Sequence, residues 1–220
     1  DWQTKMLAGE SSAQKAIDLL PGDVTLGFAP YGENLQAQVN EARAAGHEIL
    51  LQVPMEPFDY PAMDPGRGTL LAEKAAASNL ANLHQAMAQI TNYTGIMNYM
   101  GARFMADDKA MDPVMRDIGK RGLMFLDDGS TARSLSGDFA KAIGIPHAYA
   151  DVMIDAQVDR QAILAKLDEL ERIARRNGQA IGVGAAFDET IAAVAEWRNE
   201  AVARGIEFVG VSALANENRP

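Results

Sequence analysis

Carboxylate and amide side chains recur in this sequence where short apolar stretches end. In residues 47–61, the apolar stretch 49–53 runs directly into Pro54-Met55-Glu56-Pro57. Proline fixes φ and donates no backbone hydrogen bond, so two prolines hold Glu56 on a rigid support. The same kind of position is occupied by other polar residues along the chain. They are Tyr31, Gln52, Asn98, Arg103, Asp127, Asp128, Ser130, Asp151 and Asp155.

Five of these residues are acids, and two readings of them stay open. Clustered acids raise one another's pKa, which can create a general acid, a general base or a cation site. The other reading is structural, because Asp is a preferred helix cap and Asp127 or Asp128 could cap a helix starting near Arg133. Asp151 could pair with a basic helix residue. Asp155 ends an apolar stretch that faces a polar exit, and this position favours a functional role for its carboxylate.

The residue types predict no firmly bound cofactor. Zinc sites need several nitrogen or sulfur ligands close together, and this sequence has no cysteine. His47 and His147 each begin an apolar stretch, and His84 lies in a helical segment. We therefore expect no zinc held by histidines. Acids such as Glu56 and Asp127 could hold Mg²⁺ or Ca²⁺ weakly through oxygen atoms.

The elements that must position these residues alternate regularly. Apolar stretches typical of buried strands alternate with segments of helical spacing, and Gly46, Gly122, Gly178 and Gly205 follow helical segments. This alternation predicts a parallel sheet covered by helices. A closed β/α barrel is favoured over an open sheet, because the early strands lack a Gly-rich phosphate loop. The expected strands are residues 24–30, 47–54, 95–100, 123–128, 148–155, 180–187 and 206–214.

Composition limits the class of protein. The 220 residues carry a net charge of −10, and no basic stripe offsets it, so a nucleic-acid partner is not expected. No apolar run approaches the roughly 20 residues that a membrane span needs. The sequence begins at Asp1 without a signal-peptide pattern, which is compatible with an upstream export signal or anchor. We expect a single domain over residues 1–220.

The order of the phrases "GHEILLQVPMEP", "GIMNYMGARF", "FLDDGSTARS", "ADVMIDA" and "FVGVSAL" resembles the divergent polysaccharide deacetylase family. These proteins are relatives of the NodB-like carbohydrate esterases. The resemblance implies a distorted seven-stranded barrel, an exported or periplasmic location and a role in envelope carbohydrate metabolism. It also implies a divalent metal held by an Asp and two His, with a second Asp activating water.

Carried over residue by residue, the resemblance retains Glu56, Asn98, Asp127 and Asp155. Gln52 and Tyr99 stand where many relatives have histidine, and the first strand offers only Asp1 and Glu10, so that strand is short or incomplete.

Three functions therefore compete. The first is a hydrolase that cleaves amide or ester bonds of acetylated envelope glycan, with or without a weakly held metal. The second is a catalytically silent barrel that binds glycan or a protein partner. The third, which the motif order favours least, is an unrelated barrel enzyme. Glu56, Asp127 and Asp155 are the catalytic candidates. The substrate-binding candidates are Asn98, Gln52, Arg103, Tyr31, Asp128 and Ser130.

Overall fold

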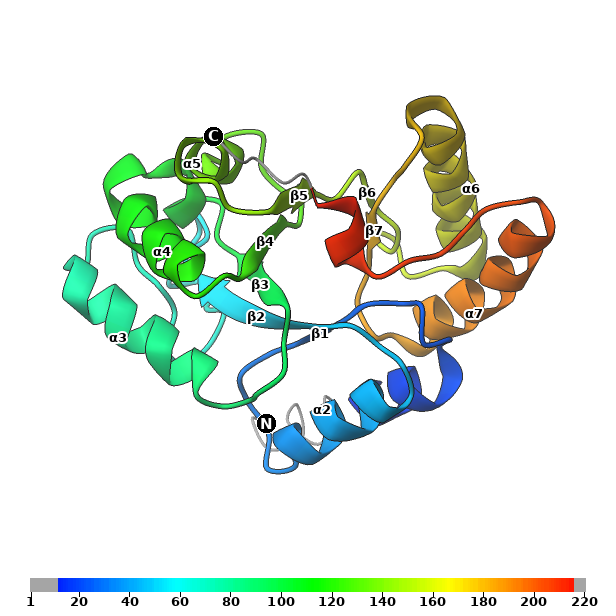
Figure 1. The fold of residues 1–220 in the computed structure, drawn as a ribbon, viewed down its shortest axis with the longest axis horizontal. Coiled ribbons are helices and arrows are strands. Elements are labelled where there is room, and N and C mark those ends of the chain that lie inside the picture. Colours follow the sequence, from blue (N-terminus) through cyan, green and yellow to red (C-terminus); the bar gives the residue numbers. More distant parts are fainter. Residues whose placement is uncertain (1–11, 216–220) are drawn as a thin grey trace. The chain divides into compact units, whose positions relative to one another are not determined.

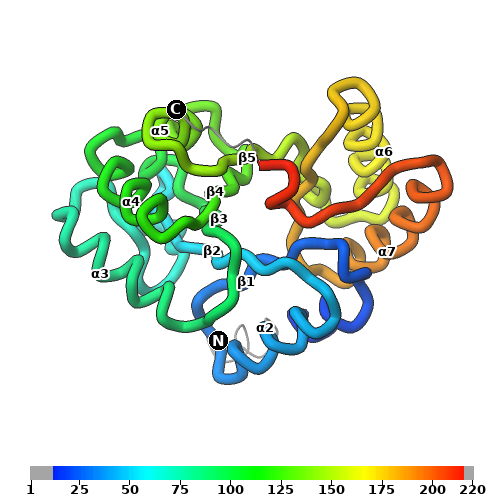
Figure 2. The backbone as a smooth tube through the Cα atoms, in the orientation of Figure 1, coloured from blue at the N-terminus to red at the C-terminus, as the bar shows by residue number. Residues whose placement is uncertain are grey.

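The computed structural model describes residues 12–215, which form two compact units. The first unit takes in residues 12–26, 32–48 and 150–214, and the second takes in residues 27–31, 49–149 and 215. The chain passes from one unit to the other several times along its length (Figure 2). The single domain expected from the sequence stays a prediction.

The second unit is built on a five-stranded sheet with the strand order β1-β2-β3-β4-β5 (Figure 1). Strands β2 to β5 pair in parallel. The α/β class with a parallel sheet is therefore confirmed. The strands are β1 (Leu26–Phe28), β2 (Ile49–Met55), β3 (Gly95–Met100), β4 (Met124–Asp127) and β5 (His147–Tyr149).

Helices α3 (Ala76–Met87), α4 (Asp108–Lys120) and α5 (Ser136–Ile143) connect these strands and pack against the sheet (Figure 1). A short 3₁₀ helix, η1 (Phe104–Ala106), follows β3. The buried core between sheet and helices contains aliphatic, aromatic and methionine side chains, whose burial supplies most of the stabilisation. Among them are Leu51, Val53, Leu83, Ile96, Phe104, Met111, Met115 and Phe125.

Strand register divides the side chains of this sheet between two faces. Successive residues of a strand point to opposite faces, and Gln52 pairs with Met97 while Val53 pairs with Asn98. One face, here called the helix face, contacts α5. It carries Val53, Asn98, Asp127, His147 and Tyr149. The opposite face, here called the Gln52 face, carries Leu50, Gln52, Met97, Tyr99, Leu126 and Ala148.

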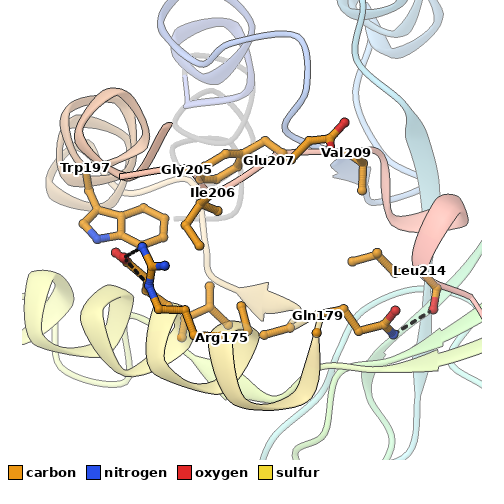
Figure 3. Close-up of a pocket in the computed structure, with 14 residues that line it drawn as sticks. Arg175, Gln179, Trp197, Gly205, Ile206, Glu207, Val209 and Leu214 are labelled. Atoms are coloured by element: carbon orange, nitrogen blue, oxygen red, sulfur yellow. Dashed lines mark hydrogen bonds and ion pairs between the residues drawn. The ribbon is translucent and has the colours of Figure 1, made fainter. Parts of the chain in front are cut away.

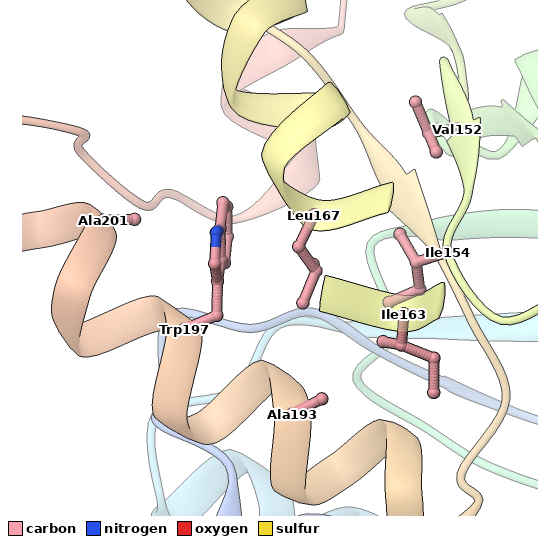
Figure 4. Packing of buried hydrophobic residues seen from close by; sticks show 7 residues of the cluster. All are labelled: Val152, Ile154, Ile163, Leu167, Ala193, Trp197 and Ala201. Atoms are coloured by element: carbon pink, nitrogen blue, oxygen red, sulfur yellow. The ribbon is translucent and has the colours of Figure 1, made fainter. Parts of the chain in front are cut away.

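The first unit contains the two-stranded parallel sheet of β6 (Val152–Met153) and β7 (Gly182–Val183). Helices α6 (Arg160–Asn177) and α7 (Asp188–Ala203) pack together around a core that includes Ile163, Leu167 and Trp197 (Figure 4). The unit also contains a helix over residues 12–19, α2 (Leu35–Ala44) and the 3₁₀ helix η2 (Val211–Leu214).

The strands of the first unit differ from the sequence prediction. The expected strand at 148–155 is interrupted and contributes to both β5 and β6, and the expected strand at 180–187 is reduced to two residues. Residues 206–210 have no regular structure, and η2 follows them. An apolar stretch becomes a strand only where a neighbouring backbone pairs with it. The prediction of a strand at 206–214 was therefore wrong. A closed seven-stranded barrel stays a prediction.

Candidate functional site

Glu56 lies at the end of β2, is 5% exposed and is surrounded by fixed hydrogen-bond donors. Its Oε1 accepts a hydrogen bond from Arg103 Nη1 at 2.9 Å, and its Oε2 accepts one from the backbone N of Ala72 at 2.6 Å. Arg103 also contacts Glu73 at 2.6 Å. The carboxylate therefore joins the end of β2 to the long loop at 57–75 and to the segment after β3.

The backbone at Glu56 makes the same connections. Its N donates to Leu70 O, and its O accepts from the N atoms of Arg103 and Phe104. These bonds explain why prolines flank this acid, because a stiff strand exit keeps the carboxylate in register with three segments at once.

Asn98 has a comparable role at the end of β3, where it is 1% exposed. Its Nδ2 donates to Met100 O at 2.8 Å, and its Oδ1 accepts from Asp128 N at 2.9 Å. Met100 has a φ of 56°, in the left-handed region that residues other than glycine rarely adopt. The Asn98 side chain thus supports a sharp turn after β3 and ties it to the end of β4.

Asp127 is fully buried on the helix face and begins a chain of hydrogen bonds. Its Oδ2 accepts from Ser136 Oγ at 2.6 Å, and Ser136 Oγ lies 2.9 Å from His147 Nε2. Burial lowers the pKa of His147, and the charge of Asp127 opposes that shift. A neutral His147 protonated at Nε2 satisfies the chain, because Ser136 then accepts from His147 and donates to Asp127. This order differs from a nucleophile activated by a histidine base, since the serine proton points at the carboxylate.

The two acids after β4 also stabilise their own turn. Asp127 Oδ1 accepts from Gly129 N and Asp128 Oδ1 accepts from Ser130 N, both at 2.9 Å. These contacts are turns within 127–130, because α5 begins later and its N-cap, Leu135, makes no side-chain bond. Asp128 is half-buried and directly follows β4, where its backbone N donates to Asn98 Oδ1.

The Gln52 face becomes accessible toward the carboxyl ends of its strands. Gln52 and Met97 are half-buried, and Tyr99 is 40% exposed. Tyr31 borders this face: its OH donates to Arg67 O at 2.6 Å, and Tyr99 contributes to the electrostatic environment that raises its pKa. Burial is the main cause that raises the pKa of Tyr31 to about 12. Tyr31 is therefore a neutral hydrogen-bonding group at neutral pH.

Asp155 and Asp151 belong to the first unit. Asp155 is 7% exposed, and its Oδ2 accepts from Ala185 N at 2.7 Å and from Thr190 Oγ1 at 2.9 Å. Asp151 Oδ2 accepts from Ile181 N at 2.8 Å. Both acids thus hold the segment around β7, and whether Asp155 shares a cleft with Glu56 and Asp127 stays a prediction.

The residues that the structure describes do not fit the metal site that the resemblance implies. His47 Nδ1 contacts Val24 O at 2.7 Å, His84 Nε2 contacts Asp117 at 3.0 Å, and His147 contacts Ser136. Within residues 12–215, no three His, Asp or Glu side chains are grouped to hold a metal ion. Asp1 and Glu10, the acids expected from the first strand, lie outside the described residues.

A cavity of about 540 Å³ lies in the first unit between α6 and residues 205–209 (Figure 3). Two of its polar side chains already have partners. Arg175 contacts Glu171 at 2.7 Å, and Gln179 donates to Leu214 O at 3.2 Å. None of the site residues predicted from sequence lines this cavity. The candidate site is therefore the carboxyl end of the Gln52 face.

The fold and this site define an α/β protein with a parallel sheet and polar groups at the carboxyl ends of its strands. Residues 7–215 match the divergent polysaccharide deacetylase family. The chain belongs to this family, which confirms the resemblance seen in its motifs.

Comparisons with individual proteins agree on the fold. A crystal structure of an uncharacterized protein from Agrobacterium tumefaciens C58 is 62% identical and has a TM-score of 0.91, covering 93% of this chain and 83% of that one. An uncharacterized Haemophilus influenzae protein is 27% identical over 90% of this chain and 70% of its own length. The uncharacterized protein YibQ of Escherichia coli is 23% identical over 90% of this chain, which spans 61% of YibQ.

Sequence reasoning missed Ser136, and it treated His147 only as the start of a strand. The pairing of Asp127 with Ser136 depends on how α5 packs on β4, and a single sequence does not contain that register.

Proposed function

We propose that this protein binds an acetylated glycan of the bacterial envelope at the carboxyl end of the Gln52 face. The observation that carries the proposal is the exposed ring of Tyr99 on the same face of the sheet as the half-buried amide of Gln52, two residues further toward the carboxyl ends of the strands. Aromatic rings offer flat apolar area to the C–H faces of sugars, and amides bond hydroxyl and acetamido groups. Family membership supports a carbohydrate as the ligand.

In this proposal, the strand-end polar residues give the site its shape. Glu56 and Asn98 fix the segments that follow β2, β3 and β4 at the carboxyl end of the sheet, and Asp127 fixes α5 on the helix face, through bonds that leave their oxygens occupied. Tyr31 and Asp128 stand at its border, where each can bond a sugar hydroxyl. Glycan binding therefore needs no change in the buried bonds of the unit.

Hydrolysis of the acetyl groups is the second candidate, and membership of a deacetylase family favours it. Water would add to the acetyl carbonyl as a carboxylate takes its proton, and the C–N or C–O bond would then break, so that acetate leaves and the proton passes to the sugar nitrogen or oxygen. Asp128 is the acid proposed for this proton transfer, because it directly follows β4 at the carboxyl end of the sheet and is only half-buried. A weakly held divalent cation stays a prediction.

A periplasmic or exported location belongs to the same proposal, since envelope glycans are found there. None of the helices within residues 12–215 has both the length and the apolar composition that crossing a bilayer requires. The distorted seven-stranded barrel in a single domain is likewise part of what the family resemblance implies.

The test is a calorimetric titration of the protein with acetylated oligosaccharides, paired with an assay for released acetate. We expect binding without acetate release, and we expect Tyr99→Ala to weaken binding roughly fivefold to a hundredfold, taking the stacking of nucleic-acid bases on aromatic rings, about 1–3 kcal/mol, as the guide. Acetate release that tracks protein concentration and disappears in Asp128→Asn would favour the second candidate.

Tyr149→Ala is the matched control. Tyr149 is also a strand-end tyrosine and is 47% exposed, but it lies on the helix face, where its OH accepts from Gly137 N. This variant should lose some stability and keep its affinity for the glycan. Equal loss of affinity in both variants would contradict the assignment of the site to the Gln52 face.

A further inference from the structure

We infer that the glycan bound at the Gln52 face is anionic and that Arg67 and Arg133 recognise its acidic groups, an inference that rests on the proposed function. Arg67 lies in the loop that follows β2, and Arg133 lies in the segment between β4 and α5. Both loops leave the carboxyl end of the sheet, where Tyr99 is exposed.

Arg133 is held in position by an aromatic ring. Its guanidinium carbon lies 6.0 Å from the centre of the Phe58 ring, a cation–π distance. Phe58 is 52% exposed and follows Pro57 directly after Glu56. The stacked guanidinium keeps its N–H edges available, and an exposed ring beside it offers the flat apolar surface that a sugar requires.

Arg67 is connected to the Gln52 face through Tyr31. The OH of Tyr31 donates to the backbone O of Arg67 at 2.6 Å, and the positive charge of Arg67 lowers the pKa of Tyr31 against the larger effect of burial. Tyr99 contributes to the environment of the same Tyr31 hydroxyl. Tyr31 thus contacts the backbone at Arg67, and the side chains of Arg67 and Tyr99 both act electrostatically on its hydroxyl.

The two arginines differ from most others in this acidic chain. Within the described residues, the arginines that form ion pairs with carboxylates include Arg103, Arg116, Arg121, Arg160, Arg175, Arg198 and Arg204. Within residues 12–215, neither Arg67 nor Arg133 has a carboxylate within ion-pair distance, although the protein carries 30 acids. An unpaired guanidinium binds carboxylate or phosphate oxygens with two parallel hydrogen bonds.

The acids near these arginines are occupied locally. Asp64 Oδ1 accepts from Gly66 N at 2.9 Å, and Asp128 Oδ1 accepts from Ser130 N. Each carboxylate thus supports its own turn, and among the described residues neither forms an ion pair with Arg67 or Arg133. The chemistry of this end of the sheet, two available guanidiniums beside exposed rings, fits a glycan built from acetylated amino sugars and acidic sugars.

Two probes of equal length separate charge from sugar recognition. One is a hyaluronan octasaccharide, in which N-acetylglucosamine alternates with glucuronic acid, and the other is a chitin octasaccharide, which has no acidic group. At low salt, the protein should bind the acidic probe roughly tenfold to a hundredfold more tightly, as expected for two charge-assisted contacts. This preference should shrink as salt is raised, because these arginines are exposed.

The variant R67Q/R133Q should reduce the preference to about one and leave chitin affinity unchanged. R172Q/R176Q is the matched control, because it removes two exposed arginines from α6 and changes net charge equally. It should keep the preference. Equal affinity of the wild-type protein for both probes, with no effect of R67Q/R133Q, would overturn the inference and leave the proposed glycan site standing. If the wild-type protein bound neither probe, both the inference and the proposed glycan site would be overturned.

Discussion

Ser136 joins two buried groups that would otherwise lack hydrogen-bond partners, Asp127 Oδ2 and His147 Nε2. Replacing Ser136 by alanine removes both hydrogen bonds and puts no other polar atom in the place of the hydroxyl. An unsatisfied buried polar group costs about 1–3 kcal/mol, so Ser136→Ala should lower the free energy of unfolding by that amount.

Urea denaturation of Ser136→Ala measures this effect, with Ser130→Ala as the control. Ser130 is exposed and takes part only through its backbone N, so its replacement should change stability by less than about 0.5 kcal/mol. If Ser136→Ala were as stable as the wild type but unable to act on a glycan, the serine would be part of a reactive site.

His147 makes stability depend on pH in a defined direction. Burial lowers the pKa of folded His147 below its ordinary value of 6.5. At pH values between the folded pKa of His147 and 6.5, the unfolded chain binds more protons than the folded chain. The free energy of unfolding therefore rises with pH in this range. The stabilisation is complete above about pH 6.5 and is lost as the pH falls through the folded pKa.

Unfolding free energies measured from pH 5 to pH 8 should therefore show a slope that His147→Gln flattens. The carboxylates with lowered pKa values, such as Asp117 and Glu171, titrate below this window and do not obscure it. An identical slope in wild type and His147→Gln would mean that another group is responsible.

At the scale of elements, Glu56 decides how the loop at 57–75 is held. Its side chain bonds Ala72 and Arg103, and its backbone bonds Leu70. Glu56→Gln keeps the shape but loses the negative charge that Arg103 faces. We expect a loss of about 1–3 kcal/mol, concentrated in local opening of this loop, because hydrogen bonds to charged groups are the stronger ones.

Hydrogen exchange read by mass spectrometry tests this locally. Peptides covering residues 57–75 should exchange faster in Glu56→Gln, while peptides from α6 should not change. Uniformly faster exchange throughout the chain would show that Glu56 supports global stability rather than this loop.

Local sequence signals predicted some elements well and others poorly. Asp159, a residue type preferred at helix starts, caps α6 by accepting from Ala162 N at 3.0 Å. Gly178 ends that helix with a φ of 85°, as expected of a glycine stop. These features depend on neighbours in sequence. The strand expected at 206–214 depended on a partner distant in sequence, and only the folded backbone shows that residues 206–210 lack one.

The same distinction applies to the candidate site. Proline spacing predicted that Glu56 is rigidly held, and its burial and hydrogen bonds agree with this. The catalytic roles of Glu56 and Asp127 and the substrate-binding role of Asn98 stay predictions. Which face each side chain occupies depends on register between strands, so the separation of the Gln52 face from the helix face could not be read from the sequence alone.

At the scale of the whole molecule, we expect no tightly bound zinc. His47 belongs to the first unit and His84 and His147 to the second, and each histidine has a different partner. Zinc needs several such ligands together. Elemental analysis of protein purified without chelators should find far less than one zinc per chain after dialysis. About one zinc per chain, lost on replacing any of these histidines, would restore a metal-dependent deacetylase.

The Gln52 face, and not the buried strand-end acids, is proposed to contact the ligand. An amide NMR titration of the protein with the hyaluronan octasaccharide tests this residue by residue. We expect dose-dependent shifts for Gln52, Met97, Tyr99 and Arg67, and little change for Ser136 and His147 on the helix face. Shifts confined to Ser136, His147 and their neighbours, with Gln52 and Tyr99 unmoved, would contradict it.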